Sequence, residues 1–426
     1  ISPTVDGDEL SFSIISGSLP TGLSFNPSNG MISGTPSQSV ISQSVTIKAF
    51  NDVSNQTFPL SFTVLQSITS FSYPNSTYVQ SAGESFSISP TVDGDELSFS
   101  IISGSLPTGL SLNPSNGMIS GIPSKSVSSQ SVTIKVSNDV SAESFTLIFT
   151  IRTSISLFAY SQALYILSKD DPFSISPTVI GDDLSFSISS GSLPTGLSLN
   201  SSNGMISGIP SQFIISQSVT IKAFNEVSNQ TFPLSFKVLT RITSFSYPNS
   251  TYVLSRNDPF SISPSINGDD LSFSTSSGSL PTGLSLNSTT GMISGIPSQF
   301  IISQSVTIKV SNDVSNDKSF SLSFTVLQSI TSFSYPNSTY VLKRNDPFSI
   351  SPTVDGDDLS FSITSGSLPI GLSFNPSNGM ISGTPSQFII SQSVTIKVSN
   401  DVSNDKSFSL SFTVLQSITS FSYPNS

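Results

Sequence analysis

Acidic side chains recur at one position of this sequence, and their oxygens could bind a metal ion. Asp6-Gly7-Asp8-Glu9 is the first of five copies, and Asn51-Asp52 could add oxygens from another loop. The later copies are Asp93-Gly94-Asp95-Glu96, Ile180-Gly181-Asp182-Asp183, Asn267-Gly268-Asp269-Asp270 and Asp355-Gly356-Asp357-Asp358. Calcium would suit such groups because it is a hard cation that takes six to eight oxygen ligands. Ile180 and Asn267 replace the first carboxylate in two copies, so we expect solvated turns, with calcium as the alternative.

The same carboxylates could be read as a glycosidase pair, because two acidic groups hydrolyse glycosidic bonds. Five near-equivalent copies on exposed turns argue against a single active site. Cysteine and histidine are both absent, which excludes thiol nucleophiles, Ser–His–Asp and Cys–His catalysis and the usual zinc ligands. The sequence therefore predicts a protein that is not an enzyme and that needs no cofactor.

N-linked glycosylation is the second chemical signal. Several asparagines begin an Asn-x-Ser/Thr motif without Pro at x, which is the acceptor for N-linked glycans in secreted proteins. They are Asn55, Asn75, Asn200, Asn229, Asn249, Asn287 and Asn337. Only 10% of the residues are charged, against roughly 25% in average proteins. Glycans on these turns would supply the hydration that charged side chains usually give, and they predict a secreted or cell-surface location.

Charge and hydropathy narrow the choice of partners. The formal net charge of −11 disfavours nucleic acid and anionic membranes. No run of about 18 apolar residues is present, so we expect no membrane insertion in this segment. All five methionines lie in one repeated motif and the chain opens on Ile1. We therefore expect a processed chain or a window of a longer polypeptide.

The repeated motif GSLPTGLSFNPSNGMISGTPS, which first begins at Gly17, organises the whole chain. Its later copies begin at Gly104, Gly191, Gly278 and Gly366, and self-similarity at a fixed long period indicates tandem domains. Aligning the copies predicts units at 1–66, 67–153, 154–240, 241–328 and 329–416, followed at 417–426 by the first strand of a further unit.

This motif has the chemistry of turns rather than of a phosphate-binding loop. Pro20 and Gly22 suit a turn between two strands, because Pro presets φ and Gly tolerates positive φ. Asn29-Gly30 suits a tight hairpin, and Gly34 ends the returning strand. No GxGxxG or GxxxxGK[ST] spacing leads into a helix. The sequence therefore predicts that these residues are structural.

Apolar and polar residues alternate at period two in the rest of each unit, with no helical period. About seven short strands in the second unit predict two packed antiparallel sheets, a β-sandwich. The last strand of each unit runs almost directly into the next unit, as at Gln66-Ser67, so we expect a rod rather than loosely joined domains. Phe71 and Tyr73 are expected to pack between units. Serines such as Ser11 and Ser98 are expected to form an outward polar face that could serve lateral contacts.

The pattern P-x-V-x-G-D-x-L-S-F-S-I, followed by G-S-L-P-x-G-L-S-F-N-x-x-x-G-M-I-S-G-T-P, resembles the He_PIG immunoglobulin-like (Ig-like) repeat family, which is related to dystroglycan-type cadherin-like domains. The resemblance covers essentially the whole chain. It implies Ig-like or cadherin-like sandwich modules strung along secreted or surface proteins, in adhesive or structural roles, and it implies no catalytic residues.

Two functions stay open at this point. The first is a structural or adhesive extracellular rod or filament of glycosylated Ig-like domains, which propagates head to tail and has copies of itself as end-to-end and lateral partners. The alternative is a carbohydrate- or protein-binding array of a larger cell-surface protein. Sugar platforms commonly use exposed aromatic rings, so the absence of tryptophan weakens the carbohydrate version.

The two ends of the sequence are complementary. Ile1 corresponds to Ile88 inside a strand, so the first unit is expected to lack its first edge strand, whereas 417–424 repeats that strand. Either a longer continuous chain was cut here, or the strand of one copy enters the first unit of the next. Both versions predict that Phe421 packs in such a first unit, against residues such as Leu10 or Ile47.

Overall fold

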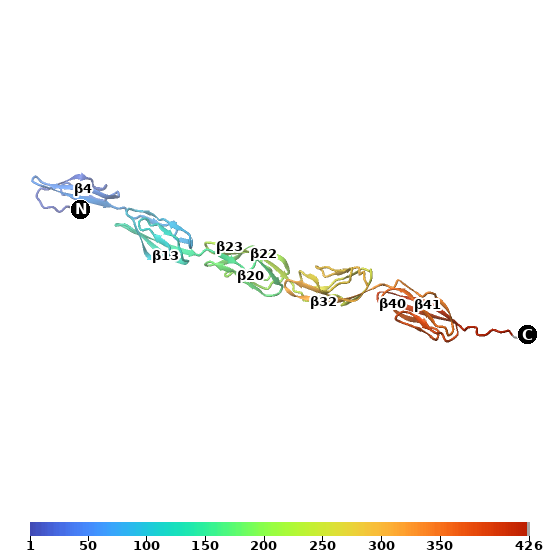
Figure 1. Ribbon diagram of the computed structural model, residues 1–426. Helices are drawn as coiled ribbons and strands as arrows, with labels where there is room; N and C mark the ends of the chain where they lie inside the picture. Colours follow the sequence, from blue (N-terminus) through green and yellow to red (C-terminus); the bar gives the residue numbers. More distant parts are fainter. Residues whose placement is uncertain (424–426) are drawn as a thin grey trace.

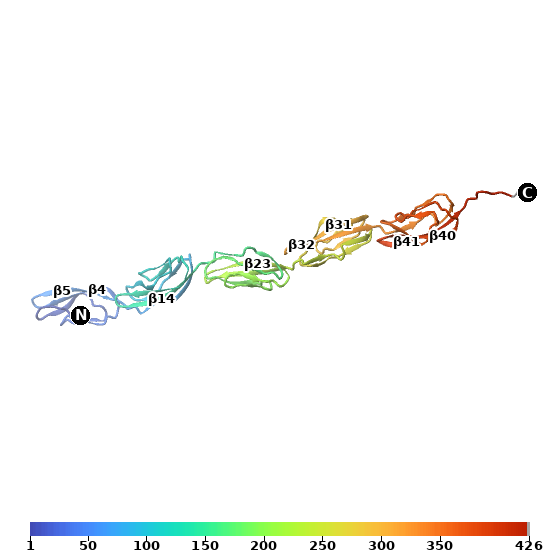
Figure 2. The ribbon, with the colours of Figure 1, turned by 90° about the horizontal axis from the view of Figure 1, so that it is seen from below.

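The computed structural model describes residues 1–423, which form five units joined end to end in a rod. The N-terminus lies in the unit at one end of the rod, and the last described residues extend beyond the unit at the other end (Figure 1, Figure 2). The described residues form strands joined by turns, which confirms the predicted all-β tandem fold. No helix in this part of the chain is long and apolar enough to cross a membrane.

The second unit shows the complete arrangement of strands. They are β6 (Ser70–Ser72), β7 (Thr77–Ser81), β8 (Phe86–Ile88), β9 (Thr91–Asp93), β10 (Ser98–Gly104), β11 (Leu110–Leu112), β12 (Ile119–Gly121), β13 (Val127–Ser137) and β14 (Ala142–Arg152). One sheet has the order β10-β13-β14-β7, in which β7 pairs parallel with β14. A second sheet has the order β11-β12-β8, and β6 pairs antiparallel with β9.

The third, fourth and fifth units repeat these nine strands and their pairing. The third contains β15 (Leu157–Ala159), β16 (Leu164–Ser168), β17 (Phe173–Ile175), β18 (Thr178–Ile180), β19 (Ser185–Gly191), β20 (Leu197–Leu199), β21 (Ile206–Gly208), β22 (Ile214–Phe224) and β23 (Asn229–Leu239). The fourth contains β24 (Ser244–Ser246), β25 (Thr251–Ser255), β26 (Phe260–Ile262), β27 (Ser265–Asn267), β28 (Ser272–Gly278), β29 (Leu284–Leu286), β30 (Ile293–Gly295), β31 (Ile301–Asn312) and β32 (Ser315–Leu327). The fifth contains β33 (Ser332–Ser334), β34 (Thr339–Lys343), β35 (Phe348–Ile350), β36 (Thr353–Asp355), β37 (Ser360–Gly366), β38 (Leu372–Phe374), β39 (Ile381–Gly383), β40 (Ile389–Asn400) and β41 (Ser403–Leu415).

A complete unit therefore has nine strands rather than about seven. Pro74 separates β6 from β7, and these two strands pair in different sheets instead of forming one interrupted edge strand. The segment Thr91–Asp93, which pairs with β6 as β9, is too short to show the alternation that marks a strand in a sequence.

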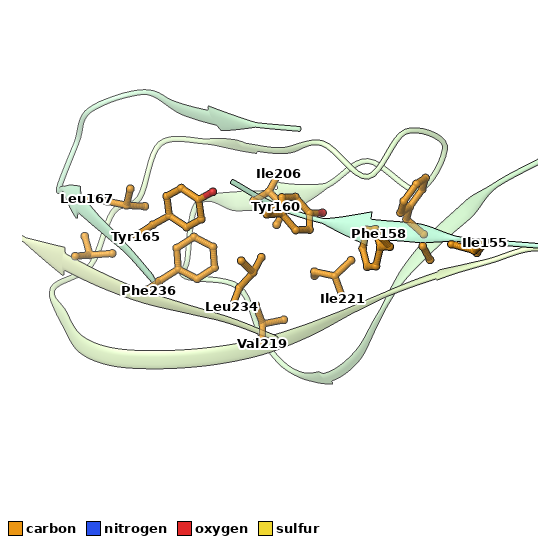
Figure 3. Close-up of a cluster of buried hydrophobic side chains, with 13 residues drawn as sticks. Ile155, Phe158, Tyr160, Tyr165, Leu167, Ile206, Val219, Ile221, Leu234 and Phe236 are labelled. Carbon is orange, nitrogen blue, oxygen red and sulfur yellow. The ribbon is translucent and has the colours of Figure 1, made fainter. Parts of the chain in front are cut away.

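One apolar core fills each complete unit between its sheets. In the third unit, Phe236 and Ile221 are fully buried, and Tyr165 stacks on Phe236 with 5.9 Å between ring centroids (Figure 3). The strand alternation puts every second side chain of β23 into this core. Burying one such large apolar side chain stabilises the fold by about 1.5–3 kcal/mol, so each unit has its own source of stability.

Phe71 and Tyr73 belong to the core of their own unit, so the expectation that they pack between units is wrong. Phe71 contacts Phe99 and Phe145, with ring centroids 5.9 and 6.3 Å away. The buried Tyr73 hydroxyl donates a hydrogen bond to the carbonyl oxygen of Gly117 at 2.6 Å. The reason is the pairing of β6 with β9 of the same unit. It turns the inner face of β6 toward this core, where a buried hydroxyl must find a partner.

The turns of the repeated motif leave no room for side chains. The amide of Leu23 donates to the carbonyl oxygen of Pro20 at 3.0 Å, and Gly22 has a φ of 95°. A Cβ atom on Gly22 would lie 2.2 Å from the carbonyl oxygen of Thr35, and one on Gly34 would lie 2.1 Å from that of Gly22. Gly30 alone takes the left-handed conformation in the second turn, with a φ of 69°.

The first unit contains fewer strands than the others. They are β1 (Ser11–Gly17), β2 (Leu23–Phe25), β3 (Ile32–Gly34), β4 (Val40–Phe50) and β5 (Asn55–Val64), in sheets ordered β1-β4-β5 and β2-β3. Ile1 exchanges backbone hydrogen bonds with Ile32, as Ile88 pairs with Ile119 in the second unit. No described segment lies over the first unit in the way that β6 lies over the second.

Candidate functional site at the junctions between units

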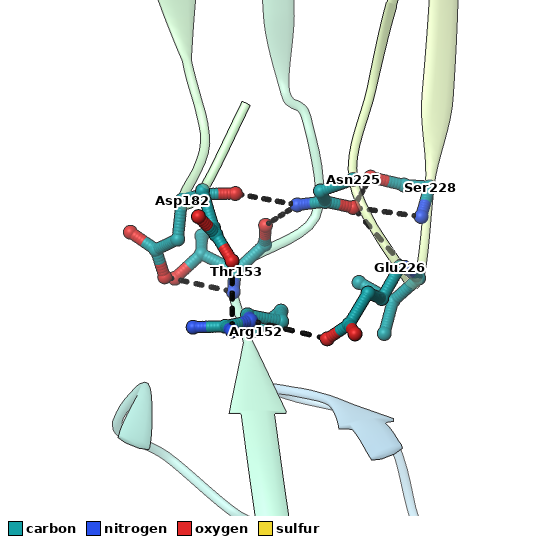
Figure 4. A network of polar contacts seen from close by, with 8 residues as sticks. Arg152, Thr153, Asp182, Asn225, Glu226 and Ser228 are labelled. Carbon is teal, nitrogen blue, oxygen red and sulfur yellow. Dashed lines mark hydrogen bonds and ion pairs between the residues drawn. The ribbon is translucent and has the colours of Figure 1, made fainter. Parts of the chain in front are cut away.

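A short segment joins the last strand of each unit to the first strand of the next. The following unit binds both the amide and the carbonyl group of one residue of this segment, which we call the linker residue. At the second junction, the amide of Thr153 donates to the carboxylate of Asp182 at 2.9 Å. The side-chain amide of Asn225 donates to the carbonyl oxygen of Thr153 at 3.0 Å and to that of Asp182 at 2.9 Å (Figure 4). The linker residue therefore has both its amide and its carbonyl group hydrogen-bonded, as a residue in a strand ladder does.

Asn225 can hold the linker because its own loop fixes its orientation. Its side-chain oxygen accepts hydrogen bonds from the amides of Val227 and Ser228 and from the hydroxyl of Ser228. The Ser228 hydroxyl in turn accepts a hydrogen bond from the amide of Ile155, two residues after the linker, at 2.8 Å. A fully satisfied polar network of this kind specifies one geometry, because any other arrangement would break several bonds at once.

The other junctions have the same construction, which we call the linker clasp: an aspartate, an asparagine and a serine around one linker residue. The amides of Gln66, Thr240 and Gln328 donate to the carboxylates of Asp95, Asp269 and Asp357 at 2.9, 3.0 and 2.8 Å. Asn138, Asn312 and Asn400 donate to the three linker carbonyl oxygens at 2.8, 3.0 and 2.9 Å. Ser141, Ser315 and Ser403 accept from the amides of Ile68, Ile242 and Ile330.

The residue just before the linker residue, at or next to the end of the last strand of each unit, adds a contact that differs between junctions. Arg152 forms an ion pair with Glu226 at 3.4 Å (Figure 4) and another with Asp183 at 2.8 Å. The equivalent Leu327 is 1% exposed, whereas Leu415, which no described unit follows, is 45% exposed. The difference shows that the following unit buries this leucine. The contact is apolar in the fourth junction and ionic in the second.

At the second junction, the clasp also changes the acidity of its aspartate. Hydrogen bonds from the side chain and the backbone amide of Thr153 hold the pKa of Asp182 below its usual value, because they favour the charged carboxylate. Lys237, at the third junction, pairs with Asp270 and Asp313, and chiefly the hydrogen bond to Asp270 raises its pKa. Both shifts favour the charged forms that the junctions use.

The residues considered for calcium are brought together, but they bind the linker instead. Asp8 and Asn51 do meet, because the Asn51 side chain donates to the Asp8 carbonyl oxygen at 3.0 Å. In the later units the second carboxylate of each copy accepts the linker amide, and Asp93 accepts hydrogen bonds from the side chains of Gln66 and Thr69. Among the described residues, no group of three or more acidic side chains is arranged for a metal ion.

The sequence analysis did not identify the asparagine and the serine of the clasp as partners that bind the linker. Their signal is visible in retrospect, since an Asn-x-x-Ser loop recurs as Asn138 to Ser141 and at the same position of every unit.

The predicted glycosylation sites Asn55, Asn75, Asn200, Asn229, Asn249, Asn287 and Asn337 are all exposed. Ser11 and Ser98 lie exposed on the edge strands β1 and β10.

The comparison with known families agrees with this architecture. The model of the family described as "Putative Ig domain" matches residues 1–67, 63–154, 155–240, 240–327 and 329–415. The chain belongs to this Ig-like family. The match repeats along the rod, which confirms the resemblance found in the sequence. No curated protein matches the chain.

Among solved structures, three of tandem Ig domains match the chain at low identity. An I-band fragment of titin, domains I67–I69, is 13% identical, with 60% of this chain and 98% of that chain covered and a TM-score of 0.39. Sidekick-1 immunoglobulin domains 1–5 are 10% identical, with 96% and 93% covered and a TM-score of 0.34. The N-terminal eight Ig domains of Down syndrome cell adhesion molecule are 10% identical, with 96% and 56% covered and a TM-score of 0.36.

Proposed function

We propose that this chain is a structural or adhesive rod outside the cell, built from N-glycosylated Ig-like domains and continued head to tail into a filament. The linker clasp is the observation that supports this most directly. A protein whose domains only carried separate binding sites would need no such hold on each linker. A rod that must keep its length and direction needs every junction fixed.

The surface chemistry supports a glycosylated, extracellular rod. All seven acceptor asparagines are exposed. Asn75, Asn249 and Asn337 share one position just before β7, β25 and β34, the second strands of their units. There the hydroxyl of Tyr78, Tyr252 or Tyr340 accepts a hydrogen bond from the backbone N–H of the asparagine. Glycans there would project from the same position of the second, fourth and fifth units and hydrate a surface that is poor in charge.

Small-angle X-ray scattering of the purified chain tests the rod. Strand rise predicts that each unit advances the axis by about 35–45 Å, so we expect a maximum dimension of about 200 Å for one copy. A compact particle of half that length would contradict the proposal.

A mass measurement tests the glycans. Protein isolated from its native source should lose mass after treatment with an enzyme that removes N-glycans. An unchanged mass would contradict the proposal that the rod is glycosylated and secreted.

A further inference from the structure

Asparagine is followed directly by glycine at several places in this chain, and this pair is chemically reactive. The backbone nitrogen of the glycine can attack the carbonyl carbon of the asparagine side chain, because glycine has no side chain to hinder the approach. The succinimide ring that forms expels ammonia, and water then opens the ring to an acidic residue. The asparagines in such pairs are Asn29, Asn116, Asn203, Asn267 and Asn378.

All of these pairs except Asn267-Gly268 lie in the second turn of the repeated motif, where the glycine nitrogen is protected. In the second unit, the Gly117 amide donates to the carbonyl oxygen of Asn113 at 2.9 Å, and Gly117 is buried. The nitrogen must lose its hydrogen before it can attack, so the hydrogen bond and the burial both oppose the reaction. The same bond joins Gly30 to Asn26, Gly204 to Asn200 and Gly379 to Asn375.

The asparagine side chains of these turns are also held. The side-chain oxygen of Asn116 accepts a hydrogen bond from the amide of Met118 at 3.0 Å. This bond restricts the rotation of the carboxamide that attack by the glycine nitrogen requires. Asn29, Asn203 and Asn378 accept the same bond from the methionine two residues later, at 3.0, 2.9 and 3.0 Å. Both reacting groups thus have partners in each of these turns.

The pair Asn267-Gly268 has neither protection. Asn267 is exposed and is the last residue of β27, and Gly268 follows the strand. Within residues 1–423, the Gly268 amide donates no hydrogen bond and the Asn267 side chain has no hydrogen-bonded partner. The nucleophilic nitrogen and the carbonyl carbon that it attacks are therefore both unrestrained at this position.

We propose that Asn267 is a site of spontaneous deamidation. The Gly268 nitrogen bonds to the side-chain carbonyl carbon of Asn267, its proton goes to hydroxide or water, and the side-chain nitrogen leaves as ammonia. Water then hydrolyses the ring. Cleavage of the new bond gives aspartate, whereas cleavage of the original peptide bond gives isoaspartate, in which the backbone runs through the former side chain. Each conversion consumes one water and releases one ammonia.

Aspartate is the residue that other units already have at this position. Asp93 in the second unit accepts a hydrogen bond from the hydroxyl of Thr69 at 3.1 Å, and Asp355 in the fifth accepts one from the hydroxyl of Thr331. The equivalent threonine of the fourth unit is Thr243. Deamidation to aspartate gives this threonine a charged acceptor, and hydrogen bonds to charged groups are the stronger ones.

Isoaspartate has the opposite effect on the third junction. It adds a methylene to the backbone between β27 and Asp269, whose carboxylate accepts the amide of the linker residue Thr240 at 3.0 Å. Asn267 itself pairs with Ser244 in β24, the first strand after the linker. The longer backbone cannot keep both contacts in place. The other units have aspartate or isoleucine at this position, so this ageing is confined to the third junction.

Peptide mass mapping of the folded chain after incubation at mildly alkaline pH tests the site. The peptide that contains Asn267 should gain the mass difference between an amide and an acid. The peptides of the turn asparagines should convert more slowly by about tenfold or more, because hydrogen bonds must open first. In guanidinium chloride all of the pairs should react at similar rates. An unchanged Asn267 in the folded chain, or equal rates at Asn267 and in the turns, would overturn the inference.

Two variants provide matched controls in the same unit. Thr290→Asn creates an asparagine–glycine pair in the protected turn, where the Gly291 amide donates to the carbonyl oxygen of Asn287 at 2.9 Å. The introduced asparagine should stay intact while Asn267 converts, and conversion of both at one rate would contradict the role of the turn. Asn267→Gln should stop the reaction at this position, because the longer side chain closes a larger ring far more slowly.

The aspartate product can be made directly as Asn267→Asp. Hydrogen exchange should then be slower in β24 and β27 than in the Asn267→Gln chain, because Thr243 has gained its charged acceptor. Equal exchange in the two variants would remove the stabilising role of the aspartate.

Discussion

Tyr247 donates its hydroxyl hydrogen to the carbonyl oxygen of Gly291 at 2.5 Å from a side chain that is 4% exposed. Gly291 has a φ of 70°, and a Cβ atom there would lie 2.5 Å from the ring of Phe273. The acceptor is therefore presented by a turn that only glycine can form. The bond ties the first strand of the unit to the turn of the repeated motif, and it recurs as Tyr73–Gly117, Tyr160–Gly204 and Tyr335–Gly379.

Tyr247→Phe should destabilise the fourth unit by about 1–3 kcal/mol, because the buried carbonyl oxygen of Gly291 loses its partner. The aromatic packing is kept. Native-state hydrogen exchange measures the effect, since amides of β30 and β31 should exchange faster while those of the other units serve as internal controls. Unchanged protection in the fourth unit would show that the hydroxyl contributes no net stability.

High pH should destabilise the units that contain this tyrosine. Burial, and secondarily the neighbouring Tyr78 or Tyr252, raises the pKa of Tyr73 and Tyr247 to about 12, and the same causes raise the pKa of Tyr160 and Tyr335. A raised pKa in the folded state means that stability is complete below pH 10 and is lost as the pH rises toward 12. The slope is at most about 1.4 kcal/mol per pH unit for each tyrosine.

Urea unfolding between pH 9 and pH 12 measures this dependence. A variant with phenylalanine at all four positions is the matched control, because its cores contain no ionisable hydroxyl at this site. It should start less stable at pH 9 and lose less stability on the way to pH 12. Parallel losses in the two proteins would assign the pH dependence to other groups.

Much of the fold could be predicted because the sequence repeats it. The spacing of Gly17 and its later copies, together with the period-two alternation of strands such as Leu97 to Ile101, indicates tandem sandwiches. The shortest strands could not be predicted, since β9 has only three residues and is defined by its partner β6. The location of Phe71 was predicted wrongly. Its closeness to the junction in sequence says nothing about which face of β6 points inward.

The candidate site was only half visible in the sequence. The carboxylates of Asp95 and its equivalents could be recognised in the sequence, and they suggested a bound cation. In the structure they accept a hydrogen bond from the backbone amide of the linker residue instead. The clasp depends on Asn138 and Ser141, which are ordinary turn residues by type. Their role arises from contacts across 72 and 73 positions of sequence, and no local pattern reports such contacts.

Removing calcium should leave the rod intact. The Asp95 carboxylate accepts the amide of Gln66, and Asp93 accepts the side chains of Gln66 and Thr69, so these oxygens already have partners within the protein. A chelator should therefore shift the Tm by less than about 1 °C, because a ligand that does not bind the folded state cannot stabilise it. A fall of many degrees that added calcium reverses would contradict this prediction.

The stiffness of the rod should depend on the asparagine of the clasp and not on the ion pairs around it. Asn225→Ala removes both hydrogen bonds to the carbonyl oxygens of Thr153 and Asp182 and also the acceptor for its own loop. Each lost hydrogen bond of this kind contributes about 0.5–1.5 kcal/mol, and losing several together should let the second junction bend. Arg152→Leu should leave it straight, because its partners are exposed, exposed ion pairs contribute at most about 1 kcal/mol, and Leu327 already serves at this position.

A distance measurement between spin labels tests this prediction. Because the chain contains no cysteine, labels attach only to cysteines that are introduced. Spin labels on Ser98→Cys in β10 and Ser185→Cys in β19, both exposed positions, report the distance between the second and third units by pulsed electron resonance. The parent and the Arg152→Leu chain should give one narrow distance distribution, and Asn225→Ala should broaden it. If Asn225→Ala kept the narrow distribution while Arg152→Leu broadened it, the ion pairs rather than the clasp would set the direction of the rod.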